Sequence, residues 1–398
     1  MKNKRIGYLS AAPRVSTRPF AAASGPRSHV VGVIRALEAL GWEVNKFIVG
    51  DRVPPKMVEG STEKALTKNW LSTLAADIIR LISGFVNSRK AWKELGSRVD
   101  WVYERYAVLQ TLGTIFTKRG VPWVLETNGI FFDEAKSERK SLVLTGIAEK
   151  IEISAYQTCD VLICVSESLK DLLIEKAGIN PNKILVVPNG VDTSFYNPDD
   201  HKPHREFEDF TVGFVGSLIP WQGINLLLEA VSELRKEGLK INATIVGDGS
   251  AREEWEQLAA KLGIIEYVKF TGRKSSDQIP EYISGFDVGY SGQIQLKIGK
   301  MYHSPLKIYE YMSMGKPVIA SSYDDAKKLI EEQGTGYLFE PGSVQDLKEA
   351  LRSAYLQRDS LQTMGLKARE EIINHHSWIS RMKETLPEIE RIMKKNHG

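Results

Sequence analysis

Short apolar runs rich in valine and isoleucine alternate along the chain with longer amphipathic stretches. Such runs are typical of parallel strands that are covered on both faces of a sheet. In the first half, the strand candidates are residues 5–10, 43–49, 101–104, 122–126, 161–165 and 183–187. In the second half, they are residues 211–215, 241–246, 268–271, 288–290, 317–321 and 336–339. This alternation predicts an α/β protein with two doubly wound parallel sheets of about six strands each.

Helical periodicity fills the stretches between these strands. The predicted helices cover residues 29–40, 167–176, 224–235, 251–262, 306–314 and 344–356. Gly41 and Gly178 follow the first two of them, and glycine in that position favours the end of a helix. Residues 359–395, the last stretch, also have a helical pattern.

One polar segment separates the two halves of the chain. Residues 197–210 include Pro198 and Pro203 and lack an apolar period, so we expect them to link two domains. The expected boundaries are 1–195 for an N-terminal domain and 196–375 for a C-terminal domain. Residues 376–398 are expected to form a C-terminal helix that returns to the first domain.

Composition narrows the class of protein. The chain has 398 residues, of which 42% are hydrophobic and 26% charged, as is usual for a globular protein. Its net charge of +3 makes nucleic acid a poor candidate partner. Cys159 and Cys164 are expected to be buried thiols rather than a disulfide. Because neither a signal peptide nor a membrane-spanning run is apparent, we expect a cytoplasmic protein.

One amphipathic stretch allows two interpretations. Residues 70–86, from Trp70 to Val86, are flanked by the basic residues Lys64, Lys68, Arg89 and Lys90. Such a helix can lie on a membrane surface or contact an apolar acceptor. It can equally cover its own domain, which is the interpretation we favour. Peripheral contact with the inner face of the membrane therefore stays open as the second interpretation.

Glycine turns follow two strands of the second half. Gly216 and Ser217 come after residues 211–215, and Gly247 ends the next strand. Ligands of doubly wound domains bind beyond the carboxyl ends of the strands. Because glycine lets the backbone approach a phosphate closely, these turns are candidate phosphate sites.

The strongest local signal is the block at residues 304–320, which begins Ser-Pro-Leu-Lys. Pro305 stands where a helix would begin, and Ser304 is a suitable N-cap. A helix N-terminus attracts anions, and Lys307 adds a positive charge to the first turn. Glu310 shares a face with Lys307. This pattern fits a site in which one charge holds a diphosphate and the other accepts ribose hydroxyls.

Taken together, these features resemble the retaining glycosyltransferases of the GT-B type, and specifically the GT4 family. The most specific pieces are Pro-Asn-Gly-Val-Asp at 188–192, Phe-Val-Gly-Ser at 214–217, Phe-Thr-Gly-Arg at 270–273 and the block at 304–320. Tyr-Glu-Arg-Tyr at 103–106 and Leu-Glu-Thr-Asn at 125–128 are similar to a branch of the family. The resemblance covers essentially the whole chain. It implies two Rossmann-like domains that face a central cleft.

The resemblance also implies an activity. A sugar would move with retention from a nucleoside-diphosphate sugar, a UDP- or GDP-sugar, to the hydroxyl of an acceptor. The leaving phosphate oxygen would take the acceptor proton, and no metal ion or other cofactor would be required. Carbohydrate, lipid-linked and small-molecule acceptors all fit, and the oligomeric state is left open.

Site residues follow from the same resemblance. Glu310 would hold the ribose, residues 304–307 would lie near the diphosphate, and the turn after residue 272 would flank the nucleobase. The implied donor-binding residues are Gly25, Gly216, Ser217, Gly247, Arg273, Lys274, Ser304, Pro305, Leu306, Lys307 and Glu310. The implied acceptor-binding residues, in the loop 24–29 and at a strand end, are Arg27, His29, Glu126 and Asn128. Lys307, Glu310 and Asn128 are expected to be the catalytic residues.

The sequence departs from the family pattern at several positions. Tyr302 stands where the family usually has the first of two glutamates, and Asn128 stands where a histidine is common. Ser217 and Gln222 occupy the positions of a phosphate-binding arginine and lysine. Either positive charge comes from Lys307 and Arg273, with Lys297 and Lys300 as further candidates, or the diphosphate relies more on helix termini.

No metal site is expected, because the histidines have no ligand spacing and no Asp-x-Asp motif occurs. Three alternatives to a transferase remain. A nucleotide-sugar 2-epimerase would share the two-domain plan. A dehydrogenase would require a Gly-x-Gly-x-x-Gly turn after the first strand, which is absent. A catalytically inactive sugar-binding relative would account for Tyr302, Ser217 and Gln222.

Overall fold

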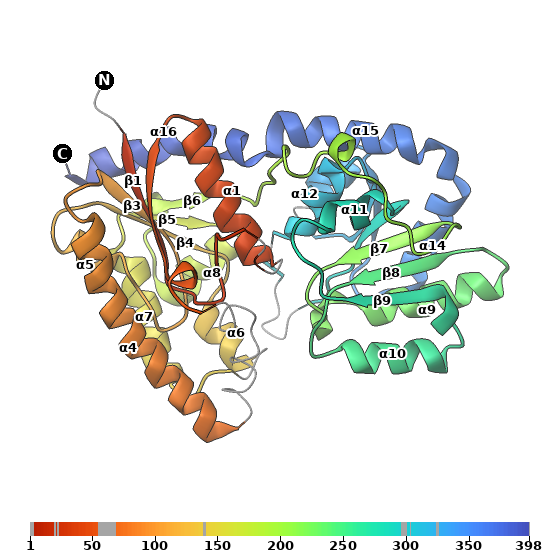
Figure 1. Ribbon diagram of the computed structural model, residues 1–398, viewed down its shortest axis with the longest axis horizontal. Helices are drawn as coiled ribbons and strands as arrows, with labels where there is room; N and C mark the ends of the chain where they lie inside the picture. The colour runs from red at the N-terminus through yellow and green to blue at the C-terminus, as the bar shows by residue number, and fades with distance from the viewer. Residues whose placement is uncertain are drawn as a thin grey trace.

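The computed structural model describes residues 4–19, 21, 24–54, 69–137, 141–295, 301–302, 304–323 and 326–397. Two α/β domains lie side by side, each built on a six-stranded sheet (Figure 1). The strand order is β2-β1-β3-β4-β5-β6 in the first sheet and β12-β11-β10-β7-β8-β9 in the second. All pairings between neighbouring strands are parallel. The expected fold class is therefore confirmed.

Every predicted strand is present, with its ends within a residue of the prediction. The first sheet contains β1 (Arg5–Ser10), β2 (Glu43–Ile48), β3 (Trp101–Arg105), β4 (Trp123–Thr127), β5 (Val161–Cys164) and β6 (Ile184–Val186). The second contains β7 (Thr211–Val215), β8 (Asn242–Val246), β9 (Val268–Gly272), β10 (Val288–Ser291), β11 (Val318–Ser321) and β12 (Gly336–Phe339). Central strands such as β4 and β8 are buried along their whole length, because helices cover both faces of each sheet.

Helices surround the two sheets. Those of the first domain are α1 (Gly25–Ala39), α4 (Trp70–Leu95), α5 (Thr114–Thr117), α6 (Phe131–Ser137), α7 (Thr145–Thr158) and α8 (Glu167–Ala177). The second half contributes α9 (Ile224–Lys236), α10 (Arg252–Lys261), α11 (Ile279–Ser284), α12 (Leu306–Ser313), α14 (Val344–Leu356), α15 (Leu361–Glu371) and α16 (Trp378–His397).

The start of α1 corrects the sequence-based expectation. Residues 24–29 were expected to form a loop, but the helix already begins at Gly25. Ser24 acts as the N-cap because its hydroxyl accepts a hydrogen bond from the backbone N–H of Arg27. Pro26 in the first turn needs no hydrogen-bond partner for its nitrogen. The Arg27 and His29 side chains therefore project from a helix.

The chain passes from one domain to the other twice, and the two connecting segments lie against each other. The N–H of Val191 donates to the carbonyl of His376, and the N–H of Trp378 donates to the carbonyl of Val191. Beyond this point, α16 packs along α1 of the first domain. The Trp378 indole lies so close to Gly32 that a Cβ there would be 2.1 Å from its ring. A glycine at position 32 therefore permits this packing.

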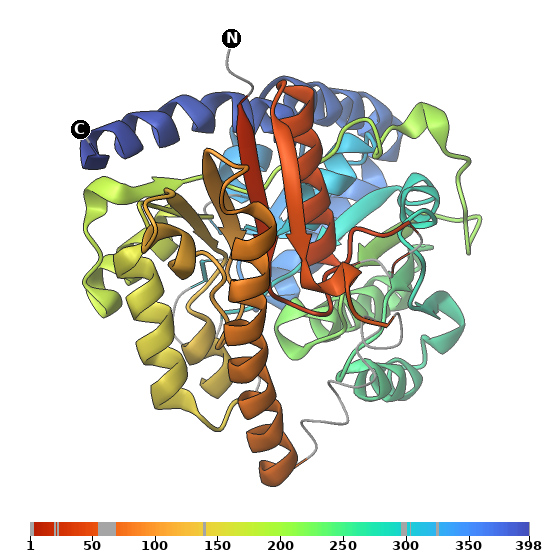
Figure 2. The same ribbon diagram turned by 60° about the vertical axis from the view of Figure 1, so that its left-hand side comes forward.

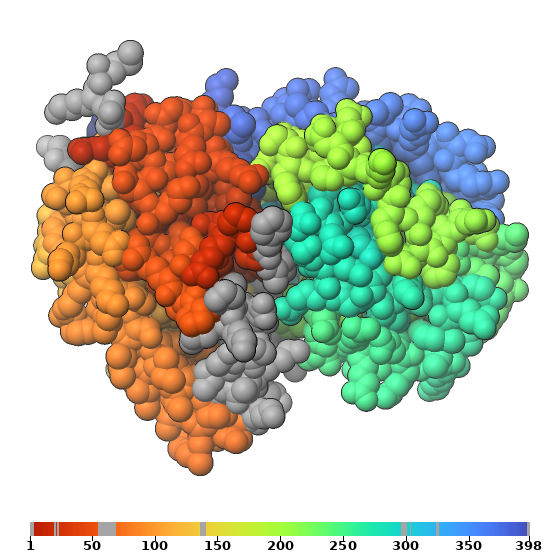
Figure 3. Space-filling view, viewed as in Figure 1, coloured from red at the N-terminus to blue at the C-terminus, as the bar shows by residue number. Residues whose placement is uncertain are grey.

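The amino-terminal end of the long helix α4 projects beyond the rest of the first domain (Figure 1). In Figure 2 its amino-terminal end reaches the lowest point of the molecule, and Figure 3 shows the same end as a projecting tip. None of the described helices is both long enough and apolar enough to cross a membrane.

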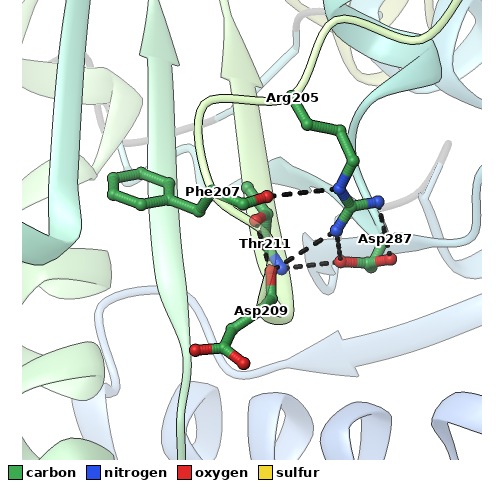
Figure 4. Close-up of polar contacts among 5 residues, drawn as sticks. All are labelled: Arg205, Phe207, Asp209, Thr211 and Asp287. Carbon is green, nitrogen blue, oxygen red and sulfur yellow. Dashed lines mark hydrogen bonds and ion pairs between the residues drawn. The ribbon is translucent and has the colours of Figure 1, made fainter.

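The segment at residues 197–210 is tied to the second domain through Arg205 (Figure 4). The two terminal nitrogens of its guanidinium lie 2.9 and 3.4 Å from the two carboxylate oxygens of Asp287. Asp287 also accepts a 2.7 Å hydrogen bond from the N–H of Thr211, the first residue of β7. These contacts fix the direction in which the chain enters the second sheet.

Candidate functional site

A cavity of about 190 Å³ lies between the two domains. It is lined by α1, by the crossing segment around Val191, by the turn after β9 and by α12. Three of the predicted site residues, Arg27, Leu306 and Glu310, contribute to its wall. Gly25 lies beside Leu306, since a Cβ built on this glycine would be 3.4 Å from Leu306 Cδ1. The structure thus brings residues of both domains to one site.

The two predicted glycine turns meet at the carboxyl edge of the second sheet. Gly247 has a φ of +143°, and a Cβ at this position would lie 1.9 Å from the carbonyl oxygen of Gly216. Only glycine fits there without moving the backbone. A Cβ at Gly216 would in turn be 3.6 Å from Lys307 Cε. The turns after β7 and β8 therefore lie against the lysine of α12.

Lys307 is buried beside the position where the family usually carries another lysine. Its Nζ donates a hydrogen bond to Gln222 Oε1 and lies 4.5 Å from the centroid of the Phe214 ring. Burial lowers the pKa of Lys307 to about 7, although the nearby Glu310 opposes this shift. Gln222 thus positions the ammonium group of Lys307, a residue of α12.

Glu310 lies one turn further along α12 and is also buried. Its Oε1 accepts a 3.0 Å hydrogen bond from the Tyr196 hydroxyl. Burial raises the pKa of Glu310 to about 7, while the Tyr196 bond and the charge of Lys307 act in the opposite direction. Because Glu310 lines the cavity and Lys307 contacts Gln222, the two side chains serve different parts of the site.

Ser304 has a different role from the one predicted. The residue before the first turn of α12 is Pro305, and no side chain caps this helix. Ser304 instead accepts a 3.1 Å hydrogen bond from the backbone N–H of Asn189, and its carbonyl accepts another from the Asn189 side chain. Ser304 therefore connects the entry to α12 with the Pro-Asn-Gly-Val-Asp motif.

Two residues expected to contact the acceptor lie inside the first domain. The His29 and Glu126 side chains are 4% and 1% exposed, and His29 Nε2 lies 2.6 Å from Glu126 Oε1. His29 Nδ1 lies 2.8 Å from Asn189 Oδ1, an acceptor, so Nδ1 carries a proton. Burial would raise the pKa of Glu126, but His29, Arg105 and Tyr103 hold it below its usual value. The two residues do not line the cavity, and their role in acceptor binding stays a prediction.

Asn128, the residue after β4, has an unsatisfied polar atom. Its Oδ1 is buried and has no hydrogen-bond partner among the residues that the structure describes. Leaving a buried acceptor unpaired costs about 1–3 kcal/mol. An incoming hydroxyl that donates to this oxygen would recover that free energy.

Tyr302 makes a contact between the domains. Its ring belongs to the core of the first domain, and its hydroxyl donates a 2.7 Å hydrogen bond to Glu134 Oε1. Its carbonyl accepts a hydrogen bond from the Ser166 hydroxyl. Sequence reasoning missed Glu134, Ser166 and Tyr196, because no local pattern marks them.

The remaining predicted residues lie nearer the surface. Ser217 and Arg273 are exposed, and Lys274 Nζ lies 5.2 Å from the centroid of the Tyr282 ring. Lys297 and Lys300 fall outside the described residues. Within the described part of the chain, no group of three or more His, Cys, Asp or Glu side chains is arranged to hold a metal ion.

Family models match both halves of the chain. The model described as Glycosyltransferase Family 4 matches residues 23–195, and the model described as Glycosyl transferases group 1 matches residues 197–371. Among curated proteins, an uncharacterized glycosyltransferase of Methanocaldococcus jannaschii is 24% identical over 298 residues, which are 73% of this chain and 76% of that protein.

Two further relatives have named activities. The GDP-mannose-dependent alpha-(1-6)-phosphatidylinositol monomannoside mannosyltransferase of Mycobacterium tuberculosis is 28% identical over 200 residues, covering 48% of this chain and about half (52%) of that enzyme. The alpha-D-kanosaminyltransferase of Streptomyces kanamyceticus is 22% identical over 274 residues, covering 67% of this chain and 69% of the relative.

Solved structures share the fold. Sucrose-phosphate synthase from Thermosynechococcus elongatus superposes with a TM-score of 0.71 at 15% identity, over 99% of this chain and all (100%) of the other. A glycosyltransferase from Rickettsia africae gives a TM-score of 0.67 at 18% identity, with the same coverage of 99% and 100%. At these identities the likeness concerns the fold, which is the GT-B arrangement of two Rossmann-like domains.

Proposed function

Because this chain belongs to the GT4 family within glycosyl transferases group 1, we propose that it transfers a sugar with retention from a UDP- or GDP-sugar to an acceptor hydroxyl. We further propose that the transfer requires no metal ion. The observation that carries this proposal is the burial of Lys307 and Glu310 on one helix, where Glu310 lines the cavity between the domains and Lys307 lies against the Gly216 turn.

Donor binding would use the two charged residues separately. The carboxylate of Glu310 faces the cavity, where it can accept hydrogen bonds from both ribose hydroxyls while Tyr196 holds its orientation. Lys307 lies against the Gly216 turn, where its ammonium group can contact the diphosphate. A diphosphate bound there would raise the pKa of Lys307 and keep its side chain charged.

In the transfer, the bond between the sugar C1 and the phosphate oxygen breaks as the acceptor oxygen bonds to C1 from the same face. The acceptor proton passes to the departing phosphate oxygen, so no side chain has to act as the base. Lys307 would stabilise the negative charge that grows on the diphosphate, in a site that excludes water. The positive charge that favours departure thus comes from the chain itself, which supports a metal-independent reaction.

The acceptor would bind on the side of the first domain. Asn128 offers a buried oxygen without a hydrogen-bond partner among the described residues, and Arg27 lines the cavity. We propose a carbohydrate, lipid-linked or small-molecule acceptor. The names of two relatives, the mycobacterial mannosyltransferase and a human phosphatidylinositol N-acetylglucosaminyltransferase subunit, refer to inositol lipids, which favours a lipid-linked acceptor.

Titration calorimetry with UDP, GDP, ADP and dTDP, each with and without magnesium, tests this function. We expect one nucleoside diphosphate to bind equally well under both conditions, while NAD, included as a control, does not bind. Binding that depends on magnesium would contradict the metal-independent mechanism. Release of a free epimerised sugar in the absence of any acceptor would contradict transfer and indicate an isomerase.

A further inference from the structure

One side of α4 exposes large apolar side chains to solvent. Leu71, Ile78, Ile79, Ile82, Phe85 and Val86 are between 41% and 69% exposed, and we call them the α4 apolar face. Trp70, at the first position of the helix, is 62% exposed. Together they make up seven of the thirteen exposed large hydrophobic side chains in the described part of the chain. Apolar side chains gathered on one surface in this way usually mark an interaction site.

The opposite side of α4 is firmly attached to the domain, so the helix cannot turn this face inward. Asp77 is fully buried and accepts hydrogen bonds of 2.8 and 3.0 Å from the N–H groups of Val143 and Leu144. Gly84 allows close packing, since a Cβ there would be 3.1 Å from Gln110 Cα. We favoured, from the sequence, a helix that covers its own domain. This interpretation accounts for only one side of α4.

Basic residues follow the α4 apolar face on the same exposed side of the helix, toward its carboxyl end. Arg89, Lys90 and Lys93 are all exposed, and the Arg89 guanidinium lies 3.4 Å from the centroid of the Phe85 ring. The two acidic residues of α4 do not offset this charge. Asp77 is buried, and Glu94 is paired with Arg52.

An apolar face followed by cations fits the interface of a bilayer with negatively charged headgroups. Apolar side chains of such a helix insert by about 5–10 Å, while lysine and arginine remain at the headgroups. Tryptophan is also favoured at this depth, which suits Trp70 at the helix end. A globular partner would instead have to provide a matching groove and acidic residues along the full length of the helix.

The position of the face in the molecule agrees with this occupant. The amino-terminal end of α4 projects beyond the rest of the first domain, so a flat surface can approach it (Figures 2 and 3). We propose that the α4 apolar face docks the first domain on an anionic lipid bilayer, and that the acceptor is carried by a lipid of that bilayer. The second part of this inference rests on the proposed function.

Flotation of the full chain with vesicles tests the docking. One set of vesicles contains phosphatidylcholine alone, and the other contains equal amounts of phosphatidylcholine and phosphatidylglycerol. We expect binding to the anionic set, weakened by salt, and a loss of about tenfold or more in the double variant Ile82→Ser/Phe85→Ser. The double variant Leu356→Ser/Leu366→Ser, which changes side chains that are 66% and 63% exposed elsewhere, should bind like the wild type.

The outcomes separate the proposals. Absence of wild-type binding to anionic vesicles, or equal binding by the α4 variant, overturns the docking. A wild-type dimer that the α4 variant converts to a monomer would assign the face to a second copy and also overturn it. Calorimetry with UDP and GDP on the same samples reports separately on the proposed function. If the protein binds a nucleotide but not the vesicles, only the docking proposal fails. If it binds the vesicles but no nucleotide, the docking proposal stands and the proposed transferase activity is contradicted.

Discussion

The hydroxyl of Tyr302 donates a 2.7 Å hydrogen bond to Glu134, and this bond joins the segment before α12 of the second domain to α6 of the first. The two side chains are only 1% and 3% exposed. Opening the cleft at this point would break this hydrogen bond between a buried carboxylate and a buried hydroxyl. At the position where the family usually has a glutamate, this chain therefore has a contact that holds its domains together.

Replacing Tyr302 by phenylalanine removes the hydroxyl but keeps the ring in the core. We expect Tyr302→Phe to lower the free energy of unfolding by about 1–3 kcal/mol, because Glu134 loses a buried hydrogen bond. Chemical denaturation measures this change. Tyr8→Phe is the matched control, since the buried Tyr8 hydroxyl has no hydrogen-bond partner among the described residues. Equal losses in the two variants would show that the Tyr302 bond contributes nothing of its own.

Glu310→Gln tests the assignment of the ribose site. A neutral amide accepts weaker hydrogen bonds than a carboxylate, so nucleotide binding should weaken by about 1–3 kcal/mol. Titration calorimetry with the preferred nucleoside diphosphate gives this value directly. The exposed residue Glu266 serves as the control, and Glu266→Gln should bind like the wild type. Unchanged affinity in Glu310→Gln would remove Glu310 from the donor site.

The same variant gives a prediction about pH. Burial raises the pKa of Glu310 from 4.5 to about 7, so between these pH values the folded state keeps a proton that the unfolded chain has lost. The contribution of Glu310 to the free energy of unfolding of the wild type then falls as the pH rises through this interval. Glu310→Gln lacks this fall, so its stability relative to the wild type should rise by up to about 1.4 kcal/mol per pH unit. Urea denaturation between pH 5 and pH 7 measures the difference, and a difference that stays constant would contradict the shifted pKa.

The strands were predictable from the sequence because a parallel strand covered on both faces must be apolar along its length, as β4 is. The start of α1 was not, because Gly25 and Pro26 are typical of a turn, whereas here Ser24 accepts hydrogen bonds from the N–H groups of Arg27 and Ser28. Local composition thus gave the correct type of element but the wrong boundary.

Within the site, Lys307 and Glu310 could be predicted because they share one turn of one helix. Their partners Gln222 and Tyr196 could not, because they lie 85 and 114 positions away in the sequence. Glu134, which is 168 positions from Tyr302, belongs to the other domain. Only the packing of the two domains brings such residues together, and no spacing rule within one segment encodes it.

Arg205 provides a prediction for the segment that leads into the second sheet (Figure 4). Arg205→Ala removes the paired contacts with Asp287 and the hydrogen bond to the Phe207 carbonyl. We expect the free energy of unfolding to fall by about 1 kcal/mol, and the melting temperature to fall with it. The loss is limited to this size because the paired geometry is favourable but the side chains are partly exposed. Arg391→Ala, which removes an exposed pair with Glu388 on α16, should have little effect. A similar shift in both variants would mean that Arg205 acts only as an ordinary surface charge.

The contact between Lys307 and Gln222 predicts that the ammonium group can be supplied from either position. Lys307→Met keeps most of the side-chain volume but removes the charge, so kcat/KM should fall by about 10²–10³. The loss of folding stability should be smaller, because a buried ammonium group is itself costly. The double variant Lys307→Met/Gln222→Lys returns the charge from the opposite side and should recover about tenfold or more of the activity. Steady-state kinetics of the two variants measures this recovery, with Gln222→Lys alone as the control that places two cations in contact. A double variant no more active than Lys307→Met would show that the position of the ammonium group on α12, rather than its charge, is what the reaction needs.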